Sequence, residues 1–297
     1  MFIHHLSLFL SNDHTIINQI LRHVGFLAVS IFLFVSGFGL MTQFKKRGEK
    51  YFNNFFTHKV LRIFMTFIFS NILVSCLSNL FLNTNYGAID IIKSSLFMKF
   101  ADGRELWFIG IIIYYYCAFY FSYHFVKIKK VSFWLLIASF LMWMLINKYF
   151  KNGTWYYNSA ISFIIGIWVA NCHQKIFEYV VKRFSVYMMI CSSAFLLVMY
   201  LYIFKEFSVL QLLAPPLFIA VIILIVIKCK LKSRFLEFMN SISLEFYLIQ
   251  IVMMEIFWGN SKSVHSITFF LVFIMTVILS KMLSLLINYI FRLNSYK

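Results

Sequence analysis

The chain has 297 residues, of which 62% are hydrophobic and only 12% are charged. Because a soluble domain carries about 25% charged residues, the composition excludes a soluble globular protein and predicts an all-α, polytopic membrane protein. The formal net charge of +17 comes from Lys and Arg residues between apolar segments, a pattern that membrane topology explains, so no nucleic-acid partner is expected.

Nine apolar runs are long enough to cross a bilayer, which takes about 20 residues per helix. They lie at 24–43, 63–82, 106–126, 131–147, 155–171, 184–204, 207–227, 242–258 and 266–291. The first ten residues, MFIHHLSLFL, add an apolar segment of only half that length. No linker, repeat or low-complexity tract divides the chain, so residues 1–297 are expected to form one integral-membrane domain.

The loops between these runs alternate in their content of Lys and Arg. One set of loops holds 18 of the 27 basic residues, and only Lys281 lies within a run. The positive-inside rule therefore places the 44–62 loop and the C-terminus in the cytoplasm. The longest loop on the outer side, 83–105, contains a segment at 88–100 with helical spacing of its apolar residues, which predicts a short interfacial helix.

Two adjacent histidines, His4 and His5, lie within the short N-terminal run. An ionisable group in an apolar segment is costly and indicates a functional role. An imidazole can act as general base on a sugar hydroxyl at neutral pH. The alternative is a terminal pair that lies frayed in the membrane interface.

The segment 26–62 combines an apolar run with a cationic end. Ser36 and Gly37 open the sequence SGFG, whose glycines permit close helix approach or leave room for a slender ligand. Lys59 and Arg62, one helical turn apart, suit a phosphate or pyrophosphate group. The cluster Lys45, Lys46 and Arg47 precedes them, although positive-inside topology alone also explains such charges.

Polar residues gather where the outer loop meets the next run, at Asp102, Arg104, Glu105 and Trp107. Carboxylates accept hydrogen bonds from sugar hydroxyls, and an indole ring stacks on a pyranose face. These four residues are therefore candidates for binding a sugar substrate. An aromatic belt at the membrane interface is the alternative.

Other intramembrane features predict contacts rather than chemistry. Glu245 and Lys281 are expected to pair, because charges within a membrane pair with each other or face a cavity. Pro215 and Pro216 are expected to kink the run that contains them. No metal-binding, Walker or dinucleotide-binding motif is present, so no metal is expected.

The chain resembles the acyltransferase 3 family of bacterial integral-membrane O-acyltransferases, in the branch that acts on surface polysaccharides. The resemblance is carried by FLFVSGFGLM, KKRGEKYFNNFF, KVLR, ELWFIGIIIYYY, WYYNSAISFIIGI and SLEFYLIQ. It implies ten helices with both ends cytoplasmic, acetyl-CoA as donor, a catalytic histidine in the first helix and a basic pair that binds CoA. The histidine corresponds to His4 or His5, and the pair to Lys59 and Arg62.

The chain departs from the family pattern at three positions. Lys59 replaces an arginine, which keeps the charge but loses the bidentate fork, and Gln250 replaces the histidine of a late YLIH motif. The family's arginine upstream of the histidine would precede Met1, which suggests a misassigned start or a truncated first helix. An extracytoplasmic SGNH domain is absent, which favours direct transfer to an acceptor at the membrane.

The hypothesis is an O-acetyltransferase of the bacterial cytoplasmic (inner) membrane. It would move an acetyl group from cytoplasmic acetyl-CoA to a hydroxyl of a cell-surface or lipid-linked glycan, of capsule, exopolysaccharide or O-antigen type. His5 or His4 would be the base, and the basic residues with Ser36 and Gly37 would bind the donor. The alternatives are a polysaccharide-precursor flippase or exporter, and a non-catalytic scaffold of a glycan-assembly complex.

Overall fold

The computed structural model describes residues 1–9, 15–96, 99–104, 107–205, 207–229, 233–259 and 266–293. Glu105 and the C-terminal residues 294–297 therefore lie outside the described residues. Throughout the described parts the chain is helical and forms no β-strand, as the composition predicts. In a bilayer a helix satisfies its own backbone hydrogen bonds, which is why apolar runs of this length become helices.

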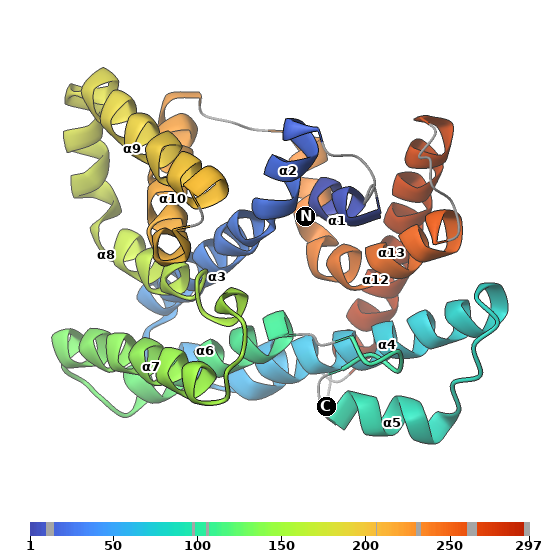
Figure 1. The fold of residues 1–297 in the computed structure, drawn as a ribbon. Helices are drawn as coiled ribbons and strands as arrows, with labels where there is room; N and C mark the ends of the chain where they lie inside the picture. Colours follow the sequence, from blue (N-terminus) through green and yellow to red (C-terminus); the bar gives the residue numbers. More distant parts are fainter. Residues whose placement is uncertain are drawn as a thin grey trace. The chain divides into compact units, whose positions relative to one another are not determined.

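The helices divide into two compact units, each described by itself. Figure 1 labels helices along the chain, coloured from the N-terminus to the C-terminus. Unit 1 comprises residues 1–22, 56–113 and 233–297, and unit 2 comprises residues 23–55 and 114–232. In unit 1 the described elements are α1 (Phe2–Phe9), α2 (Ile16–His23), the π-helical turn η2 (Phe56–Leu61), α4 (Arg62–Phe81), α5 (Ala88–Leu96), the first turns of α6 (Trp107–His124), α11 (Arg234–Ser241), α12 (Ser243–Trp258) and α13 (Ser266–Leu293).

Unit 2 holds the remaining helices. They are α3 (Gly25–Arg47), the 3₁₀ turn η1 (Gly48–Phe52), the rest of α6, α7 (Lys129–Tyr149), η3 (Thr154–Tyr156), α8 (Ile161–Lys182), α9 (Phe184–Lys205), η4 (Ser208–Leu212) and α10 (Ala214–Cys229). Each of the nine predicted runs is thus occupied mainly by helix. A short helix within the predicted segment 88–100 is confirmed as α5, which ends at Leu96.

Six helical segments in the described residues are long and apolar enough to cross a membrane, or seven if the bent pair α11 and α12 forms one span. The chain is therefore a multi-pass membrane protein. The predicted count of nine spans and a half-length helix is not confirmed: α6 and α8 occupy predicted runs but are not among the six. α1, with eight residues, is about 12 Å long and too short to cross the roughly 30 Å core of a bilayer.

The core of unit 1 is built by α4, α12 and α13, and α1 packs against α12. Buried hydroxyls on these helices bond to their own backbone: Thr66 Oγ1 donates to the Arg62 carbonyl and Ser70 Oγ to the Thr66 carbonyl, each at 2.8 Å. Thr276 and Ser280 on α13 repeat the pattern. These helices can therefore bury hydroxyl groups without leaving donors unsatisfied.

The core of unit 2 depends on close approach of α3 and α8. A Cβ on Gly37 would lie 2.2 Å from the Phe163 carbonyl oxygen, and one on Gly166 would lie 2.2 Å from the Phe34 carbonyl oxygen. No real side chain tolerates such a contact. Both glycines are therefore required for the α3–α8 packing, as small residues are at membrane helix interfaces.

The predicted kink at Pro215 and Pro216 was wrong. Pro215 and Pro216 lie in the first turn of α10, after η4, instead of kinking a helix in its middle. The first turn of a helix has no intrahelical acceptors for its N–H groups, so proline costs little there. The run at 207–227 is consequently a 3₁₀ turn followed by a helix.

Candidate functional site

The N-terminal helix α1 is fixed on two sides within unit 1. His4 Nδ1 donates to the Leu21 carbonyl at 2.9 Å, and Arg22 Nε donates to the Ser7 carbonyl at 3.2 Å, so α2 holds α1 at both ends. On the other side Phe2 packs against Phe246 of α12, with ring centroids 5.7 Å apart. The two histidines are therefore held in a defined orientation.

The two histidines make different contacts. His4 uses Nδ1 to bind α2, whereas His5 turns toward α12, where its ring lies 6.3 Å from that of Tyr247. His5 Nε2 is buried and has no hydrogen-bond partner among the described residues. A buried polar atom without a partner is costly, so this nitrogen is the one available to a ligand.

The surroundings of His5 favour its neutral form. Burial lowers the pKa of this imidazole, and the positive charges of His4, the Met1 amino group and Arg104 lower it further. At neutral pH the ring is therefore uncharged and can accept a proton. A base must be deprotonated before it reacts, so the environment suits general base catalysis.

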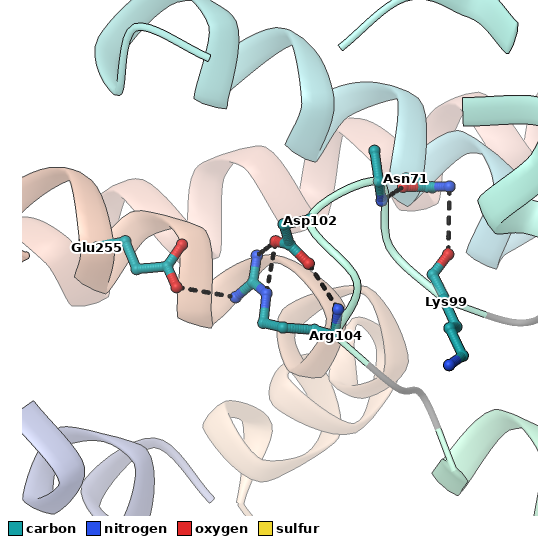
Figure 2. Close-up of polar contacts among 6 residues, drawn as sticks. Asn71, Lys99, Asp102, Arg104 and Glu255 are labelled. Atoms are coloured by element: carbon teal, nitrogen blue, oxygen red, sulfur yellow. Dashed lines mark hydrogen bonds and ion pairs between the residues drawn. The ribbon is translucent and has the colours of Figure 1, made fainter. Parts of the chain in front are cut away.

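A second part of the site is the turn that precedes α6, drawn in Figure 2. Phe100 N donates to the Arg104 carbonyl at 3.0 Å and Gly103 N to the Phe100 carbonyl at 2.9 Å. Gly103 has a φ of +84°, which glycine adopts without strain. Within the turn, Asp102 Oδ1 accepts the Arg104 backbone N–H at 2.9 Å. The turn is thus closed by its own hydrogen bonds.

Asn71 of α4 anchors this turn to the helical core (Figure 2). Its side chain is fully buried; Nδ2 donates to Ser94 Oγ and Ser95 Oγ at 2.9 Å, and Oδ1 accepts the Ala101 N–H at 3.1 Å. One amide thereby ties α5 and the turn to α4. The position of Asp102 and Arg104 is therefore set by buried contacts.

Arg104 extends from the turn to α12. Its Nε donates to Asp102 Oδ2 at 2.6 Å, and its Nη1 lies 3.5 Å from Glu255 Oε1. Figure 2 shows the guanidinium between the two carboxylates. The Arg104 side chain is 25% exposed to solvent and the Glu255 side chain is 34% exposed. The predicted acceptor residues Asp102 and Arg104 are thus brought together, with Glu255 as a third member.

Aromatic rings connect this turn with His5. Phe108, in the first turn of α6, packs edge-on against Tyr247 with centroids 5.1 Å apart, and Tyr247 in turn contacts His5. Trp107, the predicted sugar-stacking residue, begins α6 with its ring against Phe108. His5, Tyr247 and Arg104 consequently belong to one neighbourhood at α1, α12 and the start of α6.

The basic pair lies in unit 1, near the other end of α12. Arg62, the first residue of α4, donates to Asn288 Oδ1 of α13 and lies within electrostatic range of the buried Glu245. Lys59 is half-buried in the π-helical turn η2. The predicted α-helical spacing of Lys59 and Arg62 is wrong, because a π turn, with i→i+5 bonds, changes the angle between side chains.

The other predicted donor residues lie in unit 2. Lys45, Lys46 and Arg47 form the last turn of α3 rather than a loop, a position that the helix dipole favours for cations. Lys45 Nζ donates to the Ala170 carbonyl of α8 at 3.1 Å. Gly37 packs against the α8 backbone, so close helix approach accounts for it. A role of Ser36 or Gly37 in donor binding stays a prediction.

Comparison with known proteins now decides the family. A family model described as an acyltransferase domain, that of the acyltransferase 3 family, matches residues 1–287. The chain belongs to the acyltransferase 3 family. No curated protein and no solved structure matches the chain. Family membership and the membrane helices together support acyl transfer at a membrane.

One contact in this acyltransferase differs in part from the sequence prediction. Lys281 lies within electrostatic range of Glu245, as predicted, but the two make no direct ion pair among the described residues. The Lys281 ammonium lies over the Phe238 ring, 5.6 Å from its centroid. Cation–π contact with a ring is an alternative way to stabilise an amine in an apolar setting. Glu105, the fourth predicted acceptor residue, lies outside the described residues.

Three residues of the candidate site were not predicted from the sequence. Asn71 is one of two asparagines in the apolar run 63–82, the other being Asn79, and an amide inside an apolar run could have indicated a buried anchor. Glu255 lies near the end of the run 242–258, where a charge fits either an interface position or a paired one, and Tyr247 gives no signal in a tyrosine-rich chain. Gln250, at the family's histidine position, is fully buried, and its Oε1 has no partner among the described residues.

Proposed function

We propose that the protein is an O-acetyltransferase that moves an acetyl group from acetyl-CoA to a hydroxyl of a cell-surface or lipid-linked glycan. The observation that carries the proposal is His5 in a member of an acyltransferase family: its buried Nε2 has no hydrogen-bond partner in the part of the chain that the structure describes, and its helix α1 is held by α2 and α12. General base catalysis by a positioned histidine is the chemistry that this arrangement suits.

The proposed reaction has one proton transfer and one acyl transfer. His5 Nε2 takes the proton of the acceptor hydroxyl while the hydroxyl oxygen attacks the thioester carbonyl carbon. The carbon–sulfur bond breaks, the acetyl ester forms, and the CoA thiolate leaves and takes up a proton. The reaction needs no metal or redox partner.

The proposed donor site is the cationic end of α4. Arg62, whose guanidinium suits bidentate contacts with phosphate, and Lys59 would bind the phosphates of CoA. The excess of Lys and Arg in one set of loops favours a position of this end at the cytoplasmic face of the bacterial inner membrane. Acetyl-CoA is available on that side. Lys45, Lys46 and Arg47 would add positive charge on the same side of the membrane.

The proposed acceptor site lies at the turn that carries Asp102 and Arg104. Carboxylates with free lone pairs accept hydrogen bonds from sugar hydroxyls, and Trp107 offers an aromatic face. This end of α12 is on the outer side in the same topology, where a lipid-linked or nascent surface glycan is accessible.

The test uses purified protein in lipid nanodiscs with radiolabelled acetyl-CoA and the glycan fraction of a strain that lacks the gene. The proposal predicts release of free CoA in step with incorporation of label into base-labile ester. A flippase would instead move lipid-linked sugar across vesicles without consuming acetyl-CoA. That result, with no label transferred, would contradict the proposed function.

A further inference from the structure

In the Asp102–Arg104–Glu255 cluster, the charged groups contact each other as well as facing the proposed sugar site. Two carboxylates flank one guanidinium: Nε donates to Asp102, Nη2 is ion-paired with Asp102 and Nη1 with Glu255. Breaking such a half-buried ion pair by removing one partner leaves an uncompensated charge. The geometry therefore indicates a positional role for Arg104.

Glu255 supplies the connection between the turn and α12. Asn71, the Phe100–Arg104 backbone bonds and Asp102 all fix the turn to itself or to α4. The ion pair of Arg104 with Glu255 joins it to the helix that also carries Tyr247, the residue in contact with His5. Glu255 is therefore placed to set where the guanidinium lies relative to the imidazole.

We propose that Glu255 and Arg104 are positioning residues of the acyl-transfer site, in which Glu255 fixes the Arg104 guanidinium within electrostatic range of His5 and orients the acceptor turn. This inference rests on the proposed function, with His5 as the base. Arg104 acts through His5 by opposing its protonation, because a nearby positive charge disfavours a second one. Glu255 acts through Arg104 by holding it in place.

The charge of His5 depends on a small group of neighbours. His4 and the Met1 amino group lie on its own helix, Tyr247 faces it from α12, and Arg104 acts on it from the turn. Asp102 and Glu255 partly offset the charge of Arg104. Removing the Arg104 cation should therefore raise the pKa of His5, whereas removing a carboxylate should lower it.

The experiment measures acetyl transfer by the full-length protein in nanodiscs from about pH 8 down to about pH 3, because burial and nearby positive charges lower the pKa of His5 to about 3. Arg104→Gln removes the cation and leaves two carboxylates, so the pKa of His5 rises and activity falls at acid pH where the wild type is still active. Glu255→Gln keeps the cation, so no such acid loss appears. It should instead lower kcat/KM for the acceptor by about 10- to 100-fold at every pH, as misplacement of a positioned group does.

Conservative variants and matched controls separate positioning from stability. Glu255→Asp should restore part of the wild-type kcat/KM. Arg104→Lys should restore activity at acid pH but not the full kcat/KM, since lysine keeps the positive charge but lacks the paired N–H donors of the guanidinium. Glu237→Gln and Lys93→Gln, on exposed residues of α11 and α5, should match the wild type. KM for acetyl-CoA should stay unchanged in Glu255→Gln.

The outcomes separate the two proposals. If the wild type transfers acetyl groups but Arg104→Gln keeps the wild-type pH profile, the positioning role is overturned. It is also overturned if Glu255→Gln keeps the wild-type kcat/KM or raises both KM values together. If the wild type itself transfers no acetyl group, the proposed function fails before any variant is compared.

Discussion

Glu245 and Glu255 lie ten residues apart on α12, and each lies near an arginine from a different segment of unit 1. Glu255 Oε1 is 3.5 Å from Arg104 Nη1, and Glu245 is within electrostatic range of Arg62. At 1.5 Å per residue the two carboxylates are about 15 Å apart along the helix. One rigid helix therefore connects the proposed acceptor end with the proposed donor end.

The two histidines should respond differently to substitution. His5→Ala removes the buried base and should reduce kcat by about 10²- to 10⁴-fold, the usual contribution of general base catalysis. His4→Ala removes the hydrogen bond to Leu21 and the ring contact with His5 but leaves the base itself in place, so it should cost less. The measurement is acetyl transfer at saturating acetyl-CoA and acceptor.

The control for this comparison is the amount of folded protein in detergent, which should be similar for both variants. Equal losses of kcat in His4→Ala and His5→Ala would contradict the assignment of the base to His5. A larger loss in His4→Ala would move the assignment to His4.

The basic pair should affect donor binding rather than chemistry. Arg62→Gln removes a guanidinium at the start of α4 and should raise KM for acetyl-CoA by about tenfold, the order expected for loss of one charge-assisted phosphate contact of about 1.5 kcal/mol. Lys59→Arg should lower that KM, because arginine adds a bidentate fork. Steady-state kinetics at varied acetyl-CoA provides the measurement.

An exposed lysine outside the site serves as the reference for this experiment. Lys130→Gln, at the start of α7, should leave KM for acetyl-CoA unchanged. If Arg62→Gln and Lys130→Gln gave the same KM, general surface charge rather than a defined donor site would explain the basic residues.

The fold was predictable because its signal is local. Apolar runs of about 20 residues become helices in a bilayer whatever their neighbours are, and all nine predicted runs contain one. Helix ends depend on finer contacts. The helix α3 extends beyond its apolar run through Lys45, Lys46 and Arg47, and α10 begins close to Pro215 and Pro216. Hydropathy predicts neither of these helix ends.

The site was only partly predictable because its contacts are long-range. Adjacent residues such as Asp102 and Arg104 stand out in the sequence, but Glu255 joins them only when α12 packs in unit 1. Likewise, the choice between His4 and His5 depends on which ring faces α2 and which faces α12. A sequence pattern identifies candidate groups, whereas packing decides their partners.

Asn71 should stabilise the turn that carries Arg104. Asn71→Leu keeps the volume but leaves the Ala101 N–H and two serine hydroxyls without this partner, at a cost of about 1–3 kcal/mol for unsatisfied groups. Amide exchange of residues 99–104, followed by mass spectrometry, should become faster. Asn79→Leu, which alters the neighbouring 84–86 segment instead, is the control and should leave 99–104 protected.

The two glycines of the α3 motif should differ in their tolerance of alanine. Gly37→Ala places a Cβ 2.2 Å from the Phe163 carbonyl oxygen, so α3 and α8 must separate, and the cost should be about 1–3 kcal/mol, as for other overpacked cores. Gly39→Ala meets no atom within 4 Å and should be neutral or stabilising, since alanine favours helix by about 1 kcal/mol over glycine. The measurement is the thermal unfolding midpoint in detergent, with Gly166→Ala expected to behave like Gly37→Ala. If Gly37→Ala kept the stability of Gly39→Ala but raised KM for acetyl-CoA, Gly37 would be a donor-binding residue instead of a packing contact.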